Sequence, residues 1–334
     1  MTLSTSSSSG RPLKHIALFL FVMFVVLEIV TRAVLFPMSG DYVRFATYAK
    51  RADILVNQPG IGIALVGNSA TEESVDPILL KSMLEQNVPG PVHVDLFLAD
   101  GSEVSTWRAI ISHYFWRRAN KPDAIVITFF DNTLEDSDRV EWGRIAQFFT
   151  DVSDWPELFR VDLTSNASRI EFLVSSVWAT YAARDRIKQR ILTLAIPDFR
   201  RYDPILNDLN RRYANQSNRA VSAKQGTYRV LSRLLERARV EQVQVLLVAF
   251  PTRNSRYTID PKIQKLAHLT DAEVLDMRQS VKLTSRHYRD NFHLNAEGRA
   301  IYSEQFGKAV SPLLHPTTQA TKIGVTHPLR KPGT

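Results

Sequence analysis

The stretch Ile61-Gly-Ile-Ala-Leu-Val-Gly-Asn-Ser69 decides the fold: it is an apolar run that ends in a Gly-Asn-Ser turn. A short apolar run of this kind is typical of a strand buried on both faces of a parallel sheet. Ser69 follows that strand directly, at the edge of the sheet where α/β proteins bind their ligands. It is therefore a candidate nucleophile. The alternative is a serine that only caps the next helix.

Outward from this stretch, apolar runs alternate with helical patterns. Asp76-Pro77 predicts a helix start, because aspartate caps a helix and proline suits its first position. Further elements are predicted in chain order: strands at Val92–Leu98, Ala124–Phe130, Val243–Phe250 and Glu273–Met277, and helices at Glu103–Phe115 and from Asn295 to about Val310. This alternation predicts a three-layer α/β/α fold with a mainly parallel, flavodoxin-like sheet.

Composition and charge limit the possible functions. The chain has 334 residues and no cysteine, which excludes disulfides, thiol catalysis and zinc–thiolate sites. The net charge is +8, and the segment Arg184–Arg239 alone holds 14 Lys and Arg against 5 Asp and Glu. Such a segment suits an anionic envelope polymer, lipid headgroups or nucleic acid, or it is a solvated helical surface. Its candidate substrate-binding residues are Arg200, Arg201, Arg211 and Arg212.

The N-terminal region predicts a membrane anchor. Residues 16–36 are apolar except for Glu28, Thr31 and Arg32, and 21 helical residues span about 30 Å. Glu28 and Arg32 are four residues apart and are expected to pair on one helix face. The small-residue cleavage pattern of a signal peptide is missing after the span, so an uncleaved signal anchor is favoured over a cleaved one. Basic residues before the span predict a cytoplasmic N-terminus.

These patterns give the expected domain organisation: a disordered cytoplasmic N-terminus at 1–15, a transmembrane signal anchor at 16–36, an α/β domain at 37–310, and a disordered tail at 311–334. Within the α/β domain, the chain at about 135–240 is arginine-rich and predicts a helical insertion.

A second segment, Asp290-Asn-Phe-His293, completes the chemistry that Ser69 suggests. Serine needs a base, and a histidine oriented by an aspartate is the usual one. Asp290 and His293 are three residues apart, the separation of one helical turn, so their side chains can face the same way. His287 precedes Asp290 by three residues and makes a metal site the alternative. No second cluster of ligands accompanies it, so neither a metal nor another cofactor is expected.

Two positions after the next strands are candidate oxyanion donors. Gly101 follows the second strand and offers its backbone N–H, and Asn132 follows the third and offers its side-chain amide. Asp131 is the alternative to Asn132, because alternation along a strand lets only one of the two face the site. The Gly-x-Ser-x-Gly turn of α/β-hydrolases is absent, since position 71 is threonine.

Together these blocks resemble the SGNH, or GDSL-like, hydrolase family. Gly67-Asn68-Ser69 is similar to its first block, with asparagine where the usual motif has aspartate, and Ala99-Asp-Gly101 is similar to its second. Phe129-Phe-Asp-Asn132 looks like the third block without its usual glycine, and Asp290-Asn-Phe-His293 matches the last. With its N-terminal span, the chain looks most like membrane-anchored members that modify bacterial envelope polymers.

The resemblance implies a serine esterase or O-acyltransferase in the cytoplasmic membrane, with its catalytic domain in the periplasm or outside the cell. The expected partners are an acylated envelope polysaccharide or similar anionic polymer, the bilayer and a membrane-bound acyltransferase. Two other functions remain open: a non-catalytic assembly component beside such an acyltransferase, and a binder of anionic polymers. Nucleic acid is not expected outside the cytoplasm.

Overall fold

The computed structural model describes residues 10–137, 140–198, 226–253 and 257–314, and these fall into two compact units. The α/β unit comprises residues 48–140 and 227–334, and the helical unit comprises residues 1–47 and 141–226. Arg200, Arg201, Arg211 and Arg212, the predicted substrate-binding residues, lie outside the described residues.

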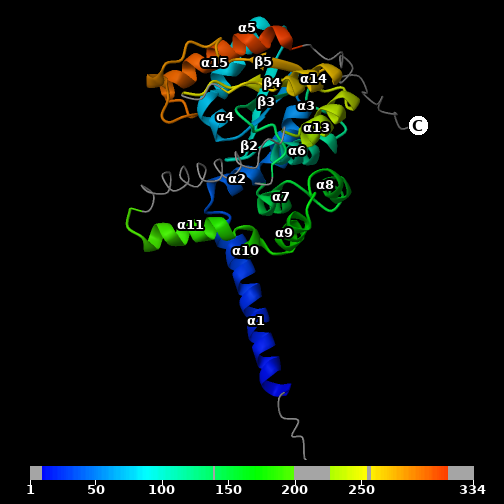
Figure 1. The fold of residues 1–334 in the computed structure, drawn as a ribbon, viewed down its shortest axis with the longest axis vertical. Coiled ribbons are helices and arrows are strands. Elements are labelled where there is room, and N and C mark those ends of the chain that lie inside the picture. Colours follow the sequence, from blue (N-terminus) through cyan, green and yellow to red (C-terminus); the bar gives the residue numbers. More distant parts are fainter. Residues whose placement is uncertain (1–9, 138–139, 199–225, 254–256, 315–334) are drawn as a thin grey trace, which may run out of the picture. The chain divides into compact units, whose positions relative to one another are not determined.

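The α/β unit is built on one five-stranded parallel sheet (Figure 1). Its strands are β1 (Ile61–Gly67), β2 (Val92–Leu98), β3 (Ala124–Phe129), β4 (Gln244–Ala249) and β5 (Glu273–Asp276). Their order in the sheet is β2-β1-β3-β4-β5, so the chain reverses its direction of travel across the sheet between β1 and β3. This is the predicted flavodoxin-like order, in which ligands bind beyond the carboxyl ends of the strands at that reversal.

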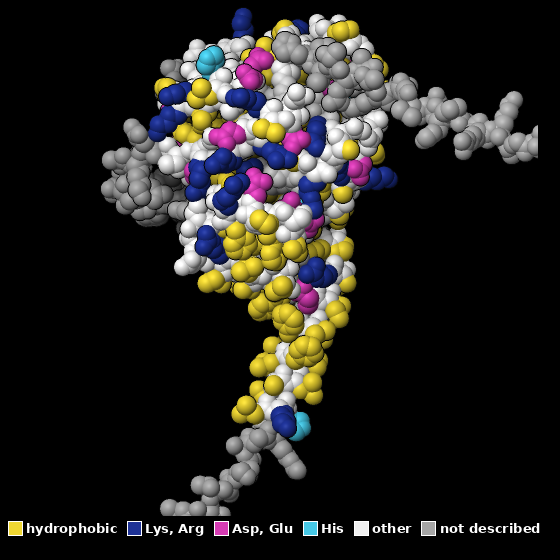
Figure 2. All heavy atoms as spheres, turned by 90° about the vertical axis from the view of Figure 1, so that its right-hand side faces the viewer, with side chains coloured by type: hydrophobic (Ala, Val, Ile, Leu, Met, Phe, Trp, Pro, Cys, Tyr) yellow, Lys and Arg dark blue, Asp and Glu magenta, His cyan; other side chains and the backbone are white. Residues whose placement is uncertain are grey.

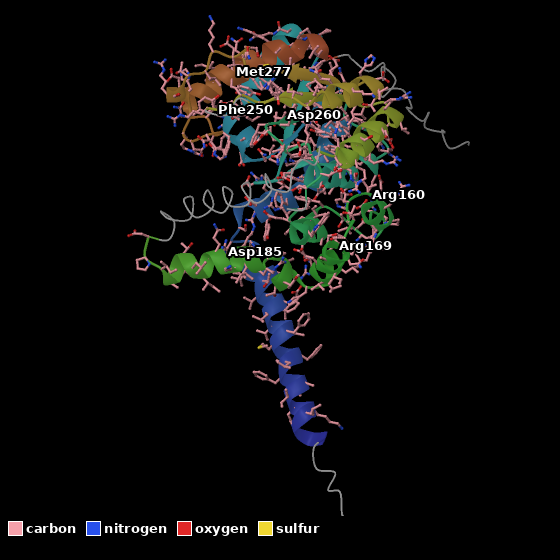
Figure 3. The ribbon with its side chains drawn as sticks, viewed as in Figure 1. Arg160, Arg169, Asp185, Phe250, Asp260 and Met277 are labelled. Atoms are coloured by element: carbon pink, nitrogen blue, oxygen red, sulfur yellow. The ribbon has the colours of Figure 1, made fainter. Side chains whose placement is uncertain are left out.

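Helices pack on both faces of this sheet, as predicted. The helices of the unit are α3 (Tyr48–Asn57), α4 (Ser69–Ser74), α5 (Pro77–Asn87), α6 (Val104–Ile111), η2 (Ser112–Trp116), α13 (Arg229–Val240), α14 (Pro261–Leu269), η3 (Ser285–His287), α15 (Ala296–Val310) and η4 (Ser311–Leu313). One face carries α5 and α15, whose buried Leu80, Leu84 and Phe306 join the same apolar core as Ile63 and Leu65 of β1. The opposite face carries α3, α6 and α13. Phe250 and Met277, which follow β4 and β5, are buried in the same core as Leu80 and Phe306 (Figure 3).

Side-chain caps define the ends of the helices that the sequence predicts. The Asp76 carboxylate accepts the N–H groups of Ile78 and Leu79, and Pro77 occupies the first helical position of α5. The Asn295 side chain accepts the Gly298 N–H and starts α15, which ends at Val310. Both helix starts were predicted from these residues, and a cap of this kind contributes about 1 kcal/mol.

The helical unit contains the N-terminal helix and most of the chain between β3 and α13, from residue 141 to residue 226. Its helices are α1 (Gly10–Val30), η1 (Thr31–Leu35), α2 (Gly40–Ala46), α7 (Trp142–Phe148), α8 (Trp155–Val161), α9 (Asn166–Val177), α10 (Ala179–Ala182) and α11 (Arg184–Ala195). Residues Leu13–Leu35 form one helix that is long and apolar enough to cross a membrane. The predicted Glu28–Arg32 ion pair is present at 2.8 Å between Arg32 Nε and Glu28 Oε1.

The structure differs from the sequence predictions at both ends of the chain. Residues 10–15 belong to α1 instead of a disordered segment, because the helix continues before its apolar stretch. Ser311–Leu313 form a 3₁₀ turn and Leu314 is buried, so order extends a few residues beyond Val310. An insertion was predicted at about 135–240. The structure separates residues 141–226 from the α/β unit and groups them with residues 1–47.

Candidate active site

Three predicted residues form a continuous hydrogen-bonded chain in the α/β unit. His293 Nε2 lies 3.0 Å from Ser69 Oγ, and His293 Nδ1 lies 2.6 Å from Asp290 Oδ2. The carboxylate can only accept, so Nδ1 carries the proton and the lone pair of Nε2 faces the serine hydroxyl. This is the arrangement in which an imidazole can remove a proton from serine.

Asp290 and His293 lie in a tight loop and not on a helix. An isolated antiparallel bridge between Tyr288 and Leu294 closes that loop. The Asp290 carboxylate accepts the backbone N–H groups of Phe292 and His293, at 3.0 and 2.9 Å, so it fixes the loop as well as the imidazole ring. Helical spacing predicted that Asp290 and His293 pair. The two side chains do pair, but they lie in a loop and not on a helix.

Contacts from the loops that follow β3 and β4 hold this histidine loop in place. The Tyr288 hydroxyl donates to the carbonyl of Pro251 at 3.2 Å, and burial raises the pKa of Tyr288 to about 12. The Arg253 N–H donates to the Asn291 carbonyl at 2.9 Å. The Phe292 ring stacks on Phe130, which follows β3, with centroids 5.2 Å apart.

The electrostatics of the loop favour an ionised aspartate. Burial alone raises the pKa of the Asp290 carboxyl, but hydrogen bonds from the His293 ring and from the backbone N–H groups of Phe292 and His293 outweigh it. The pKa of Asp290 therefore lies below its ordinary value. An ionised Asp290 is the form that orients His293 and stabilises the imidazolium that forms during proton transfer.

Ser69 occupies the first position of α4, directly after the turn that ends β1. Asn68 caps this helix through its side-chain oxygen, which accepts the Ala70 N–H at 3.1 Å. Its Nδ2 donates to the Ser102 carbonyl at 3.3 Å, a bond that the aspartate of the usual family motif cannot make because a carboxylate has no proton to donate. Gly67 is required here, because a Cβ would collide with the Thr71 hydroxyl.

Backbone hydrogen bonds join the loops that follow β1, β2 and β3. Ala99 N–H donates to the Gly67 carbonyl at 3.1 Å, and Val104 N–H donates to the Thr133 carbonyl at 3.0 Å. Gly101 lies in the β2 loop at φ +63°, a conformation that glycine adopts without strain. The two candidate oxyanion positions are thus held in loops fixed to the loop that carries Ser69.

The turn after β3 corrects one sequence expectation. The strand ends at Phe129, and both Asp131 and Asn132 lie in the turn beyond it, with Asp131 at φ +51°. Strand alternation therefore does not decide which of the two side chains faces the site. Among the residues that the structure describes, no hydrogen bond is seen between the triad and Gly101 or Asn132, and both are exposed.

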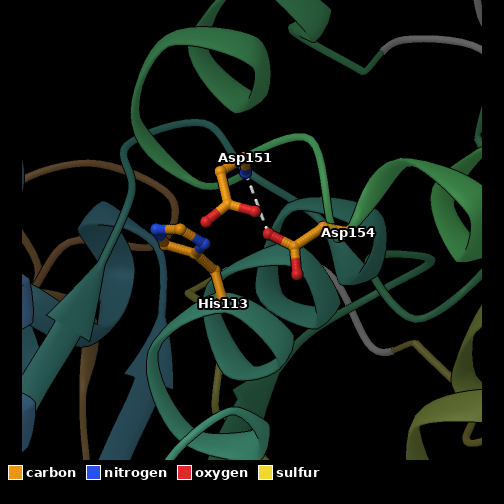
Figure 4. A group of neighbouring side chains, drawn as sticks. All are labelled: His113, Asp151 and Asp154. Atoms are coloured by element: carbon orange, nitrogen blue, oxygen red, sulfur yellow. Dashed lines mark hydrogen bonds between the residues drawn. The ribbon is translucent and has the colours of Figure 1, made fainter.

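Two groups of side chains contain residue types that can ligate a metal. His287 is buried, and its Nδ1 accepts the Thr284 N–H at 2.9 Å, so it is turned away from the ligand role that its spacing suggested. Figure 4 shows the second group, Asp151 and Asp154 of the helical unit, where the Asp151 N–H donates to the Asp154 carboxylate at 2.9 Å.

Sequence comparison adds no relative: no family model matches the chain, and no curated protein matches it. The chemistry therefore rests on the geometry of the site. The sequence predicted that Ser69, His293 and Asp290 come together, as they do, but it did not predict the hydrogen bond of the Asn68 amide or the Phe130–Phe292 stack. The asparagine at position 68, where the SGNH motif has aspartate, was the sequence feature that could have indicated the hydrogen bond of the Asn68 amide.

The lowered pKa of Asp290 predicts how stability depends on pH. An aspartate with a folded-state pKa below its unfolded value of about 3.8 contributes stability that is full above that value and is lost as the pH falls through the folded pKa. We expect Asp290→Asn to lower the thermal unfolding temperature at pH 7. The difference from the wild type should shrink only below about pH 4. A difference that disappears between pH 5 and 7 would contradict this electrostatic account.

Proposed function

We propose that the protein is a serine esterase or O-acyltransferase of the SGNH type. The observation that carries this proposal is the hydrogen-bonded chain from Ser69 Oγ through His293 to Asp290. Its position at the reversal of strand order, beyond the carboxyl end of β1, is where α/β folds bind their ligands.

In the proposed reaction, Ser69 Oγ attacks the carbonyl carbon of an acyl ester while His293 Nε2 takes the serine proton. The tetrahedral intermediate collapses, and His293 returns that proton to the leaving alcohol. Water or a sugar hydroxyl then attacks the acyl-serine with His293 again as the base. Water gives hydrolysis, and a sugar hydroxyl gives transfer.

The oxyanion donors proposed are the backbone N–H groups of Ser69 and Gly101 and the side-chain amide of Asn132. Ser69 N–H lies in the first turn of α4, where helical N–H groups have no partner within the helix. The hydrogen bonds that join the three loops support this assignment, because donors fixed before the reaction need no reorganisation when charge develops.

The N-terminal helix and the net positive charge bear on the location and the substrate of the protein. The helix Leu13–Leu35 could anchor the protein in a bilayer. Basic residues before it favour a cytoplasmic N-terminus, which places the site in the periplasm or outside the cell. An acylated, anionic envelope polysaccharide is the substrate class that suits the net positive charge, and a membrane-bound acyltransferase is the proposed partner.

Substitution of the nucleophile and the base tests the reaction class. Ser69→Ala should abolish labelling by a fluorophosphonate and lower the hydrolysis of p-nitrophenyl acetate by roughly 10⁴-fold or more. His293→Ala should cost about as much, and the double variant little more, because the two residues act as one unit. Losses that add in the double variant, or hydrolysis that persists in Ser69→Ala, would refute the triad mechanism.

Substitution in the turn after β3 tests the oxyanion assignment. Asn132→Ala should lower kcat by about 10²–10³ with KM nearly constant, because the amide donates mainly to the transition state. Asp131→Ala, at the neighbouring position, is the control and should leave kcat close to that of the wild type. If the control loses turnover while Asn132→Ala keeps it, the donor has been assigned to the wrong residue.

A further inference from the structure

The outer part of the N-terminal helix is bound to the corner between α9 and α10. The Glu28 carboxylate accepts the backbone N–H groups of Ala179 and Thr180, at 3.0 and 3.2 Å. The Thr31 and Thr180 hydroxyls are 2.9 Å apart, and the Trp178 ring lies 5.4 Å from that of Phe24 between centroids. All these residues belong to the helical unit, so the corner has a defined height along α1.

That height puts the corner inside the outer part of the span. Residues from Leu13 to Leu27, before the charged Glu28, would cover only about 22 Å, which is short of the roughly 30 Å hydrocarbon core. The whole helix to Leu35 is needed to span it, and Glu28 then lies about 10 Å below its outer end. Trp178, whose ring packs against Phe24, lies deeper still, within the apolar part of the span.

The helices on both sides of the corner expose apolar side chains. In α9, Ile170, Leu173 and Val177 follow helical spacing, and Val177 is 71% exposed. In α11, Ile191 and Leu194 are exposed, and Leu194 reaches 88%. Hydrophobic side chains gather at the base of the globular part, where α1 leaves it, and continue along α1 (Figure 2). A water-soluble surface rarely carries so many together.

The other side of α11 is fastened to its own unit. Arg186 pairs with Asp41, and Arg190 donates to the carbonyl of Met38 at 2.8 Å. Ile191 and Leu194 stay exposed although Arg190 is anchored, and Lys188 is exposed three residues before Ile191. An apolar stripe beside basic residues is typical of helices that lie in the membrane interface, with their cationic groups at the lipid phosphates.

We propose that α9, α10 and α11 form an interfacial layer that enters the leaflet where α1 ends, with its exposed apolar side chains below the headgroups. The lipid bilayer is the occupant of the exposed apolar surface, because that surface continues from the helix that spans it. This layer holds the helical unit at a fixed depth instead of leaving it tethered by a single helix. The inference concerns membrane contact alone and does not depend on the chemistry of Ser69.

Site-directed spin labelling tests the proposal, since the chain has no cysteine of its own. Val177→Cys and Leu194→Cys, each nitroxide-labelled on the full chain in vesicles of neutral and anionic phospholipid, report depth from collisions with oxygen and with a water-soluble nickel chelate. Both labels should favour oxygen and lie about 5–10 Å below the phosphates. Phe21→Cys, inside the span, provides the reference for a buried label.

Ile78→Cys is the matched control, because Ile78 is an exposed apolar residue of the α/β unit. Its label should collide freely with the chelate. If the Val177 and Leu194 labels behave like this control while the Phe21 label is buried, the interfacial layer is disproved. Labels shielded from both oxygen and chelate would show that protein covers the surface, which also overturns the proposal. The activity of Ser69 enters none of these outcomes.

Discussion

The contact between His293 Nε2 and Ser69 Oγ, at 3.0 Å, joins residues that are 224 positions apart in the chain. Only the parallel sheet brings them together. Its order reverses between β1 and β3, so the loops after these strands diverge and leave room at the carboxyl edge. The histidine loop returns to that edge from beyond β5 and is held there by contacts to the loop after β4. The site therefore depends on the register of the whole sheet.

Much of the α/β unit could be predicted from the sequence. The strand bounds agree with the predictions to within one residue. For β1, β3 and β4 the reason is that central strands buried on both faces are nearly unbroken apolar runs. Asp76 and Asn295 mark helix starts through local hydrogen bonds, so nearby residues suffice to find them. Ser69, His293 and Asp290 were predicted as a group from the chemistry that serine needs, and the structure brings their side chains within hydrogen-bond distance.

The remainder depends on contacts that local patterns do not encode. The histidine loop is shaped by Tyr288 and by Arg253, which belongs to a different loop. The second bond of Asn68 requires the carbonyl of Ser102 from the next loop. The grouping of the N-terminal helix with α10 depends on the Glu28 carboxylate, which accepts the N–H of Ala179 at the start of α10, 151 residues later. Each of these is set by tertiary packing, which overrides local propensity.

The central claim is that Ser69 carries the acyl group during turnover. The most direct test is to mix the protein rapidly with p-nitrophenyl acetate and to analyse the intact protein and its peptides by mass spectrometry. The account predicts one acetyl group on the peptide that contains Ser69, formed in a burst and lost as product continues to appear. In Asp290→Asn the acetyl group should form more slowly, because the imidazole is held in the wrong tautomer. Steady turnover without acetyl on that peptide, or with acetyl on another residue, would contradict the account.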